Sequence, residues 1–196
     1  MKEIDSEIPK ALLEMMLAFE VTSQTLAALR DSISTSFIKN KTSLILPNEI
    51  CHSVYFIVSG GFVCRYYDER LPEGKTIYFY LDELHPFMAC VDSFFTRTPT
   101  KCELQAIRDA EVVSLRMDAL TPLMETDANL FRFFHSVVLR ALLEEHEFRL
   151  KLIAFTSYRL YQHLIQHFPA IIREVPSRYI AEFMGITPEW LTKLKS

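Results

Sequence analysis

The sequence predicts an α+β protein in which a β-rich domain with flanking helices precedes a long helix and a C-terminal pair of short helices. The hydrophobic spacing changes twice along the chain. It is helical near the N-terminus, typical of strands from about residue 37 to residue 116, and helical again after Pro122. Short β-rich runs separated by turn residues favour a small antiparallel barrel or sandwich over a βαβ sheet.

The composition is that of a globular protein with either one substantial core or a domain and a smaller appendix. The chain has 196 residues, of which 49% are hydrophobic, and a formal net charge of -4. This charge argues weakly against DNA binding, but from Thr156 onward five Lys or Arg residues outnumber three Glu residues. We find no N-terminal signal segment and no apolar run near the roughly 18 residues that span a bilayer. We therefore expect a cytoplasmic protein without a membrane span.

Two short helices are expected at residues 8–30, before the β-rich segment. The apolar runs that follow end at turn residues such as Pro47 and the pair Gly60 and Gly61, and the polar residues 68–75 predict a loop. The predicted strands are residues 44–46, 54–58, 62–67, 76–81, 103–107 and 111–116.

The cysteines predict no metal centre. They lie too far apart for a CxxC motif and are dispersed among predicted strands and turns, where a small buried hydrophobe is the ordinary role. Cys51 and His52 are adjacent, but no third haem or metal ligand lies nearby in sequence. We expect reduced thiols and no cofactor. The four cysteines are Cys51, Cys64, Cys90 and Cys102.

Neither a metal site nor a catalytic residue is predicted elsewhere. His163 and His167 have the i, i+4 spacing of a two-histidine metal site, but without an acidic or sulfur partner nearby a surface helix face is preferred. The chain contains no nucleophile elbow, phosphate loop, HExxH or paired-carboxylate motif in a convincing context. An enzyme is therefore not expected.

Apolar residues after Pro122 predict one long helix at residues 126–155. Several nearly follow the alternating steps of four and three that form a coiled-coil seam, with Glu145 as the one polar interruption. A second apolar flank, which includes Phe131 and Leu142, lies on a different side, so one face should pack on the β domain and the other on a second copy. A wholly intramolecular core helix is the alternative. The predicted dimer interface consists of Phe134, Val138, Ala141, Phe148 and Leu152.

Residues 175–195 predict a helix-turn-helix. Apolar residues at helical spacing precede Gly185, which permits the positive φ of a sharp helix end. Thr187 is a suitable N-cap and Pro188 suits the first helical position, so a second helix should begin at once. The second helix of such a motif can enter the major groove of DNA. An ordinary helical hairpin is the alternative interpretation.

Three segments carry a resemblance to a known family. Residues 54–63 read VYFIVSGGFV, residues 44–49 read LILPNE, and residues 181–194 read AEFMGITPEWLTKL. They resemble the LYFI-x-SG strand and turn, the PGE turn and the A-x-x-L-G-I-T-x-E-T-L-S-R-I helix pair of the Crp/Fnr family. These are the bacterial regulators related to the catabolite activator protein and the fumarate-nitrate regulator. Asn48 stands where the family has glycine, and asparagine tolerates a left-handed turn.

The resemblance covers nearly the whole chain, and it implies three parts. Residues 1–125 would form a sensor domain, an antiparallel, jelly-roll-like β-roll similar to cyclic-nucleotide-binding domains. Residues 126–155 would form the long dimerisation helix, and residues 156–196 a helix-turn-helix DNA-binding domain. Only two residues follow Leu194, so we expect that domain to lack a full wing.

The segment that binds cyclic nucleotides in this family departs from its pattern. Nucleotide binders carry F-G-E and then R-S/T-A, whereas this chain has LDEL at residues 81–84 and TPTKC at residues 98–102. Asp82 replaces the glycine and the arginine is lost, so a cyclic phosphate would face a carboxylate without a fork-shaped cation. Only Arg97 or Lys101 could substitute, and cyclic AMP is not an expected ligand. The candidate pocket residues are Tyr80, Glu83, Arg97, Thr100 and Lys101.

We therefore predict a homodimeric transcription regulator that senses a ligand other than the common cyclic nucleotides and binds a palindromic site in double-stranded DNA. RNA polymerase is a candidate further partner. A β-roll interaction or ligand-sensing protein that has lost DNA binding is the alternative.

Helical geometry indicates which side chains would face DNA. Glu189 is suited to accept a hydrogen bond from cytosine N4, and Lys193 to contact guanine or phosphate. Pro188 replaces an arginine that reads guanine in the best-known relatives, so a different half-site is expected. Trp190 could pack against the sugar-phosphate backbone or against its own scaffold, and the scaffold is favoured. The predicted DNA contacts are Ser177, Arg178, Thr187, Glu189, Thr192, Lys193 and Lys195.

Overall fold

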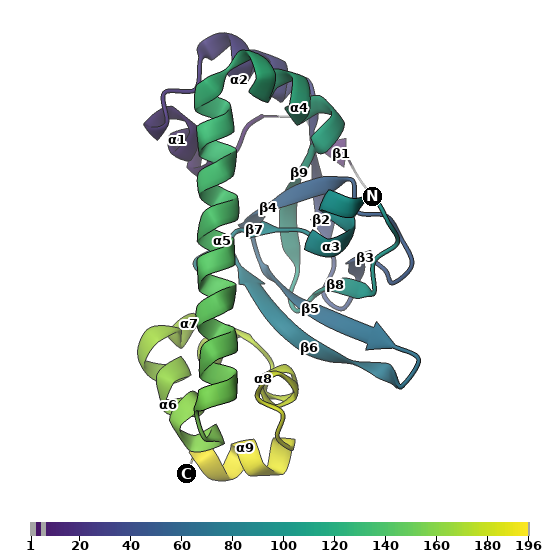
Figure 1. Ribbon diagram of the computed structural model, residues 1–196, viewed down its shortest axis with the longest axis vertical. Coiled ribbons are helices and arrows are strands. Elements are labelled where there is room, and N and C mark those ends of the chain that lie inside the picture. Colours follow the sequence, from purple (N-terminus) through teal and green to yellow (C-terminus); the bar gives the residue numbers. More distant parts are fainter. Residues whose placement is uncertain (1–2, 5–6, 196) are drawn as a thin grey trace.

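The computed structural model describes residues 3–4 and 7–195 (Figure 1). One long helix, α5 (Ala128–Ala154), runs along the molecule, with the β domain against one side and the C-terminal helices around one end. Helices α1 (Lys10–Ala18) and α2 (Ser23–Arg30) lie near the other end of α5. This arrangement confirms the predicted α+β class.

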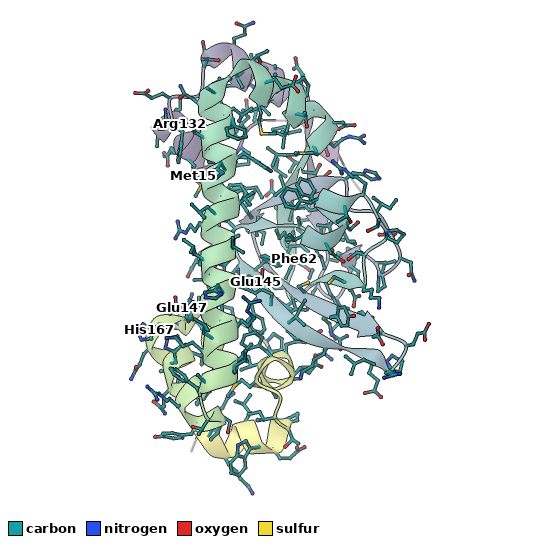
Figure 2. The ribbon with its side chains drawn as sticks, viewed as in Figure 1. Met15, Phe62, Arg132, Glu145, Glu147 and His167 are labelled. Carbon is teal, nitrogen blue, oxygen red and sulfur yellow. The ribbon has the colours of Figure 1, made fainter. Side chains whose placement is uncertain are left out.

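The β domain consists of two antiparallel sheets, as expected. Their strand orders are β1-β2-β9-β4-β7 and β3-β8-β5-β6. The strands are β1 (Glu3–Ile4), β2 (Ile33–Ile38), β3 (Ser43–Ile45), β4 (Ser53–Ser59), β5 (Gly61–Asp68), β6 (Leu71–Leu81), β7 (Phe87–Met88), β8 (Cys102–Ala106) and β9 (Ala110–Arg116), with helix α3 (Val91–Thr96) before β8. Residues of both sheets contribute to one buried core, and Figure 2 shows Phe62 within it.

Two turns have the backbone that the sequence suggested. Gly60 links β4 to β5, which lie in different sheets, and has a φ of +106°. A Cβ at Gly60 would lie 2.4 Å from the Cβ of Ala110, so only glycine fits there. Asn48 has a φ of +71°, which confirms that asparagine takes the left-handed turn.

Two parts of the β domain differ from the prediction. β2 was not expected, because its serines and threonine obscure the apolar alternation; Ser34 in this strand hydrogen-bonds Ser114 of β9 at 2.7 Å. The loop expected at residues 68–75 is wrong, since β6 already begins at Leu71. Strand pairing and polar contacts support this hairpin, among them the 2.8 Å hydrogen bond that Arg65 donates to the carbonyl of Glu73. Apolar periodicity cannot reveal such a strand.

A capping residue separates α5 from α4 (Met117–Thr126), which contains Pro122. The carboxylate of Asp127 accepts hydrogen bonds from the N–H of Asn129 at 2.9 Å and from both the N–H and the hydroxyl of Thr22 at 3.0 Å. Burial acts to raise the pKa of Asp127, but these hydrogen bonds lower it below the usual range. Asp127 thus begins α5 and joins it to the start of α2.

The C-terminal helices share a core with the β domain. They are α6 (Ser157–His167), α7 (Pro169–Glu174), α8 (Ser177–Met184) and α9 (Pro188–Lys195). One apolar cluster contains residues of all four helices together with Phe148 of α5 and Phe79 and Leu81 of β6. The helix pair is therefore packed onto the β domain of its own chain.

Candidate nucleic-acid interface

The first helix of the predicted pair, α8, is held by its buried face. Ile180 is fully buried, and the ring of Phe183 lies 4.9 Å from the ring of Phe79 and 5.8 Å from that of Phe148. The helix ends at Gly185, which has a φ of +68° as predicted. Aromatic packing therefore fixes the position of α8.

Polar contacts also join α8 to the β domain. One carboxylate oxygen of Glu182 accepts hydrogen bonds from the hydroxyl of Thr76 at 2.7 Å and from its N–H at 3.2 Å, and lies 3.5 Å from Arg65. The hydroxyl of Tyr179 donates to the amide oxygen of Gln105 at 2.7 Å. Because these groups are partly buried, their hydrogen bonds define how α8 is oriented on the sheet.

The second helix, α9, presents most of its surface to solvent. The Thr187 hydroxyl accepts a hydrogen bond from the N–H of Trp190 at 3.2 Å, which confirms Thr187 as the N-cap. Leu191 is fully buried, and Leu194 packs partly on the same cluster. One buried leucine per two turns attaches the helix and leaves its outer face open, as a helix that enters a groove requires.

The seven predicted DNA contacts are all exposed. The ammonium of Lys195 donates to the hydroxyl of Ser177 at 2.7 Å, which brings the end of α9 to the start of α8. Arg178 lies over the ring of Tyr179, 4.3 Å from its centroid. Hydrogen bonds from its own backbone N–H and from Thr187 lower the pKa of Glu189, so this side chain is a carboxylate at neutral pH and an acceptor.

Trp190 contacts its own scaffold, as expected. Its indole N–H donates to the hydroxyl of Ser157 in α6 at 3.2 Å. Lys193 lies 5.9 Å from the centroid of the same ring. About half of the ring remains exposed, so Trp190 also forms part of the outer face of α9.

Comparison with known proteins identifies the architecture. No protein-family model and no curated protein matches the sequence. FixK2 from Bradyrhizobium japonicum superposes with a TM-score of 0.67, at 15% identity over 83% of this chain and 82% of its own. A structure from Eubacterium rectale, described as a transcriptional regulator of the Crp/Fnr family, gives 0.68 at 15% identity over 91% and 83%. The chain has the Crp/Fnr fold.

A third solved structure is similar to nearly the whole chain. A cyclic nucleotide-binding domain containing protein from Listeria monocytogenes EGD-e superposes with a TM-score of 0.66, at 14% identity over 94% of this chain and 88% of its own. At such identities the likeness establishes the Crp/Fnr fold and leaves the chemistry to this chain's own residues.

The five candidate pocket residues have different partners in this Crp/Fnr fold. Glu83 is exposed and pairs with Arg173 of α7, whose guanidinium lies 2.7 Å from its carboxylate. Lys101 pairs with Asp68 at the end of β5, at 2.8 Å. Both side chains therefore interact with neighbours on the surface.

The remaining candidates lie elsewhere in the β domain. The hydroxyl of Thr100 is buried and donates to Asp92 at 3.1 Å. The guanidinium of Arg97 donates to the carbonyl of Cys51 at 3.3 Å, and Tyr80 is half-buried in β6. These residues were grouped by the resemblance to the nucleotide-binding segment of the family, and their role in a ligand pocket stays a prediction.

Asp82 forms an ion pair with a cation that the sequence analysis had not identified, Arg108. One nitrogen of Arg108 lies 2.9 and 3.0 Å from the two carboxylate oxygens of Asp82, and the other pairs with Glu174 of α7 at 2.5 Å. Asp82 also accepts a hydrogen bond from the N–H of Gly60 at 2.8 Å. The expectation of an uncompensated carboxylate is therefore wrong, and Asp82 instead links the β4–β5 turn to the C-terminal helices through Arg108.

Side chains occupy the space between β6 and α5. His85 is buried, and its Nδ1 lies 2.8 Å from a carboxylate oxygen of Glu144 on α5. The rings of Tyr78 and Phe148 lie 5.3 and 6.2 Å from the His85 ring. Burial lowers the pKa of His85, and Glu144 opposes that shift. No sequence pattern had indicated this histidine.

The predicted seam of α5 faces its own chain for most of its length. Phe148 is only 4% exposed and, with Leu152, belongs to the C-terminal cluster. Phe134 packs on the β domain and Val138 is half-buried, whereas Ala141 is exposed. The prediction is therefore wrong for Phe148, because its ring is already enclosed by the intramolecular core.

A different face of α5 is apolar and uncovered. Its large side chains fall on one side of the helix and are between 45% and 79% exposed. A single chain rarely leaves such a stripe in water. The stripe consists of Phe131, Leu139, Leu142, Leu143, Leu150 and Ile153.

The described part of the chain offers no evident metal centre. The rings of His163 and His167 lie 4.5 Å apart, but among residues 3–4 and 7–195 no three His, Cys, Asp or Glu side chains gather as a metal site. No helix in these residues is long and apolar enough to cross a membrane.

Proposed function

We propose that this chain is a homodimeric transcription regulator that binds DNA through α9. The observation that carries the proposal is the exposed, capped α9 beside a firmly packed α8, in a chain with the Crp/Fnr fold. Leu191 attaches α9 to the core, while its polar and basic side chains point to solvent. This is the arrangement in which a recognition helix contacts base edges with the residues of its first turns.

The apolar stripe of α5 supports dimer formation. Pairing the stripe with that of a second copy about a two-fold axis would remove Phe131, Leu142 and Ile153 from water. The same axis would relate the two α9 helices. The DNA site is then a palindrome with half-site centres about 34 Å apart, or a multiple of that distance.

Two residues of α9 are assigned to base reading. Glu189 carries an ionised carboxylate that can accept from cytosine N4, and Lys193, one turn further, can reach guanine or phosphate. Lys195 and Ser177 are proposed to contact the sugar-phosphate backbone, since both are exposed and lie within hydrogen-bond distance of each other.

Mobility-shift titration against the DNA upstream of the protein's own coding sequence tests this assignment. Glu189→Ala should relax the preference at one base pair by about 1–3 kcal/mol. Lys195→Ala should weaken binding to all sequences alike and reduce the salt slope by about 1, because it removes one phosphate contact. If neither substitution changed binding at 50 or 200 mM salt, α9 would not be the DNA-binding helix.

The β domain is proposed to sense a ligand other than the common cyclic nucleotides. Tyr78, His85 and Phe148 fill the space between β6 and α5, and the cation nearest to Asp82, Arg108, is bound to two carboxylates. A cyclic phosphate would have to displace Asp82 or Glu174 from Arg108, which costs charge-assisted hydrogen bonds.

Isothermal calorimetry should accordingly detect no binding of cyclic AMP or cyclic GMP at ligand concentrations up to about 100 μM. A dissociation constant of that size corresponds to a binding free energy of about -5.5 kcal/mol. Asp82→Gly, which restores the family's glycine and leaves Arg108 paired with Glu174 alone, is the matched variant. Micromolar affinity of the wild-type protein for either nucleotide would contradict the proposal.

A further inference from the structure

A lysine of the β domain, Lys75, lies beside the turn between α8 and α9. Strand β6, which carries Lys75, packs against α8 (Figure 1). An ideal Cβ placed on Gly185 would lie 3.8 Å from the ammonium nitrogen of Lys75. Gly185 ends α8, and α9 begins at Pro188. A cation from outside the helix pair therefore lies next to the start of the helix that is proposed to enter DNA.

The charge of Lys75 has no partner in its own chain. Its side chain is exposed, and within residues 3–4 and 7–195 its ammonium forms no hydrogen bond or ion pair. Arg65, the cation of β5 that reaches α8, is engaged instead. It donates to the carbonyl of Glu73 at 2.8 Å and lies 3.5 Å from the carboxylate of Glu182. Lys75 can thus bind an external anion without breaking an ion pair.

The backbone on either side of Lys75 is held in place. The hydroxyl and the N–H of Thr76, the next residue, both donate to Glu182 of α8, at 2.7 and 3.2 Å. On the other side, Gly74 has a φ of +69°, and a Cβ there would lie 2.6 Å from the ring of Tyr67. Because β6 is anchored to α8 at this point, binding an anion would restrict only the side chain of Lys75.

The geometry of helix-turn-helix binding shows what anion would lie there. The first helix of such a motif crosses the DNA backbone, and the second enters the major groove with its N-terminal residues against the bases. The turn that joins the two helices then lies beside the sugar-phosphate backbone at the edge of the groove. A lysine at this turn can reach a phosphate as a flexible point charge.

We propose that Lys75 contacts a phosphate of the DNA backbone, so that the β domain supplies part of the DNA-binding surface. The inference rests on the proposed function and adds to it a contact from outside the helix pair. The contact exists only while α8 is docked on β6, since that docking brings Lys75 to the turn. DNA affinity is thereby tied to the position of the helix pair on the β domain.

Mobility-shift titration of the full-length protein from 50 to 200 mM salt, on the DNA upstream of its own coding sequence, tests the contact. Lys75→Gln should reduce the salt slope by about 0.9, because one phosphate contact is lost. As that contribution vanishes towards 1 M salt, binding at 0.1 M should weaken about eightfold. Lys75→Arg should bind within about twofold of the wild type, because it retains the charge.

Two further variants make the result specific. Lys10→Gln removes an exposed lysine of α1, near the other end of α5 (Figure 1), and should leave the slope unchanged. An equal effect of Lys10→Gln would show that only net charge matters and would overturn the inference. If Lys195→Ala reduced the slope but Lys75→Gln did not, Lys75 would lie outside an interface that α9 does form. A wild-type protein that bound no DNA would overturn the proposed function, and this inference with it.

A chemical probe of distance gives an independent result. The four native cysteines are buried free thiols, as expected from the sequence, so in Lys75→Cys an iron–EDTA reagent should attach to the exposed introduced thiol. We expect this group to cleave the DNA backbone at the edge of each half-site, and the same group on Lys10→Cys to leave the DNA intact. A complex of the labelled Lys75→Cys protein that forms without cleavage would contradict the position assigned to Lys75.

Discussion

Replacing Leu142 with glutamate is expected to convert the proposed dimer into monomers. Leu142 is 60% exposed in the single chain and lies near the middle of the apolar stripe of α5. In a two-fold dimer the substitution would place two carboxylates close together and out of water, which costs several kcal/mol. A loss of about 3 kcal/mol raises the dimer dissociation constant more than 100-fold, so sedimentation equilibrium at micromolar concentration should show monomers.

DNA binding should fall with dimerisation. A dimer engages both half-sites at once, and this bivalency contributes a factor of about 10²–10⁴ to its apparent affinity. Leu46→Glu is the matched control, because Leu46 is also an exposed leucine but lies in the loop after β3, on the β domain. A Leu142→Glu protein that stays dimeric, or a monomeric wild type, would contradict the assignment of the stripe.

Phe148→Ala should have the opposite pattern, a large loss of stability without loss of the dimer. The Phe148 ring lies 4.6 Å from the ring of Phe168 and 5.8 Å from those of Tyr78 and Phe183. Removing a buried aromatic ring costs about 3–5 kcal/mol, because it leaves a cavity that the surroundings fill only in part. Urea unfolding at a fixed protein concentration measures the loss.

Phe131→Ala is the matched variant on the same helix. Phe131 is 53% exposed in the single chain, so its loss should change the stability of one chain little and weaken the dimer. If Phe148→Ala instead dissociated the dimer while the urea midpoint stayed unchanged, the face predicted from the heptad spacing would be the true interface.

The helix pair could be predicted from the sequence because its signals are local. Gly185, Thr187 and Pro188 each act on the backbone within one or two residues of their own position, and the structure places them as expected. The strand-and-turn segment around Gly60 was predictable for the same reason, since the apolar run of β4 is followed directly by the glycines of the turn.

The buried face of α5 could not be predicted in the same way. The helix is apolar on two sides, and spacing alone does not show which side meets the β domain. That choice depends on Tyr78 and Phe168, which reach Phe148 from β6 and from the end of α6, far away in the sequence. The two apolar faces of the helix were therefore predicted correctly. Part of the face predicted to meet a second copy packs instead on the same chain, and the other face is exposed.

Contacts between distant elements were equally hidden. Arg108 reaches Asp82 only because the turn before β9 lies beside the end of β6, and Lys75 lies beside Gly185 only because β6 packs against α8. Such contacts depend on the register of the whole sheet and on what packs against it, so neither the ion pair nor the position of Lys75 could be derived from spacing in the chain.

Selection of binding sites from random double-stranded DNA by the full-length protein at low salt tests the proposed function most directly. We predict an enriched palindrome whose half-site centres lie about 34 Å apart, or a multiple of that distance, and in Glu189→Ala a motif with relaxed preference at one symmetric pair of positions. Failure to enrich any palindrome with folded wild-type protein, or an identical motif from Glu189→Ala, would contradict the assignment of α9 as the helix that reads DNA.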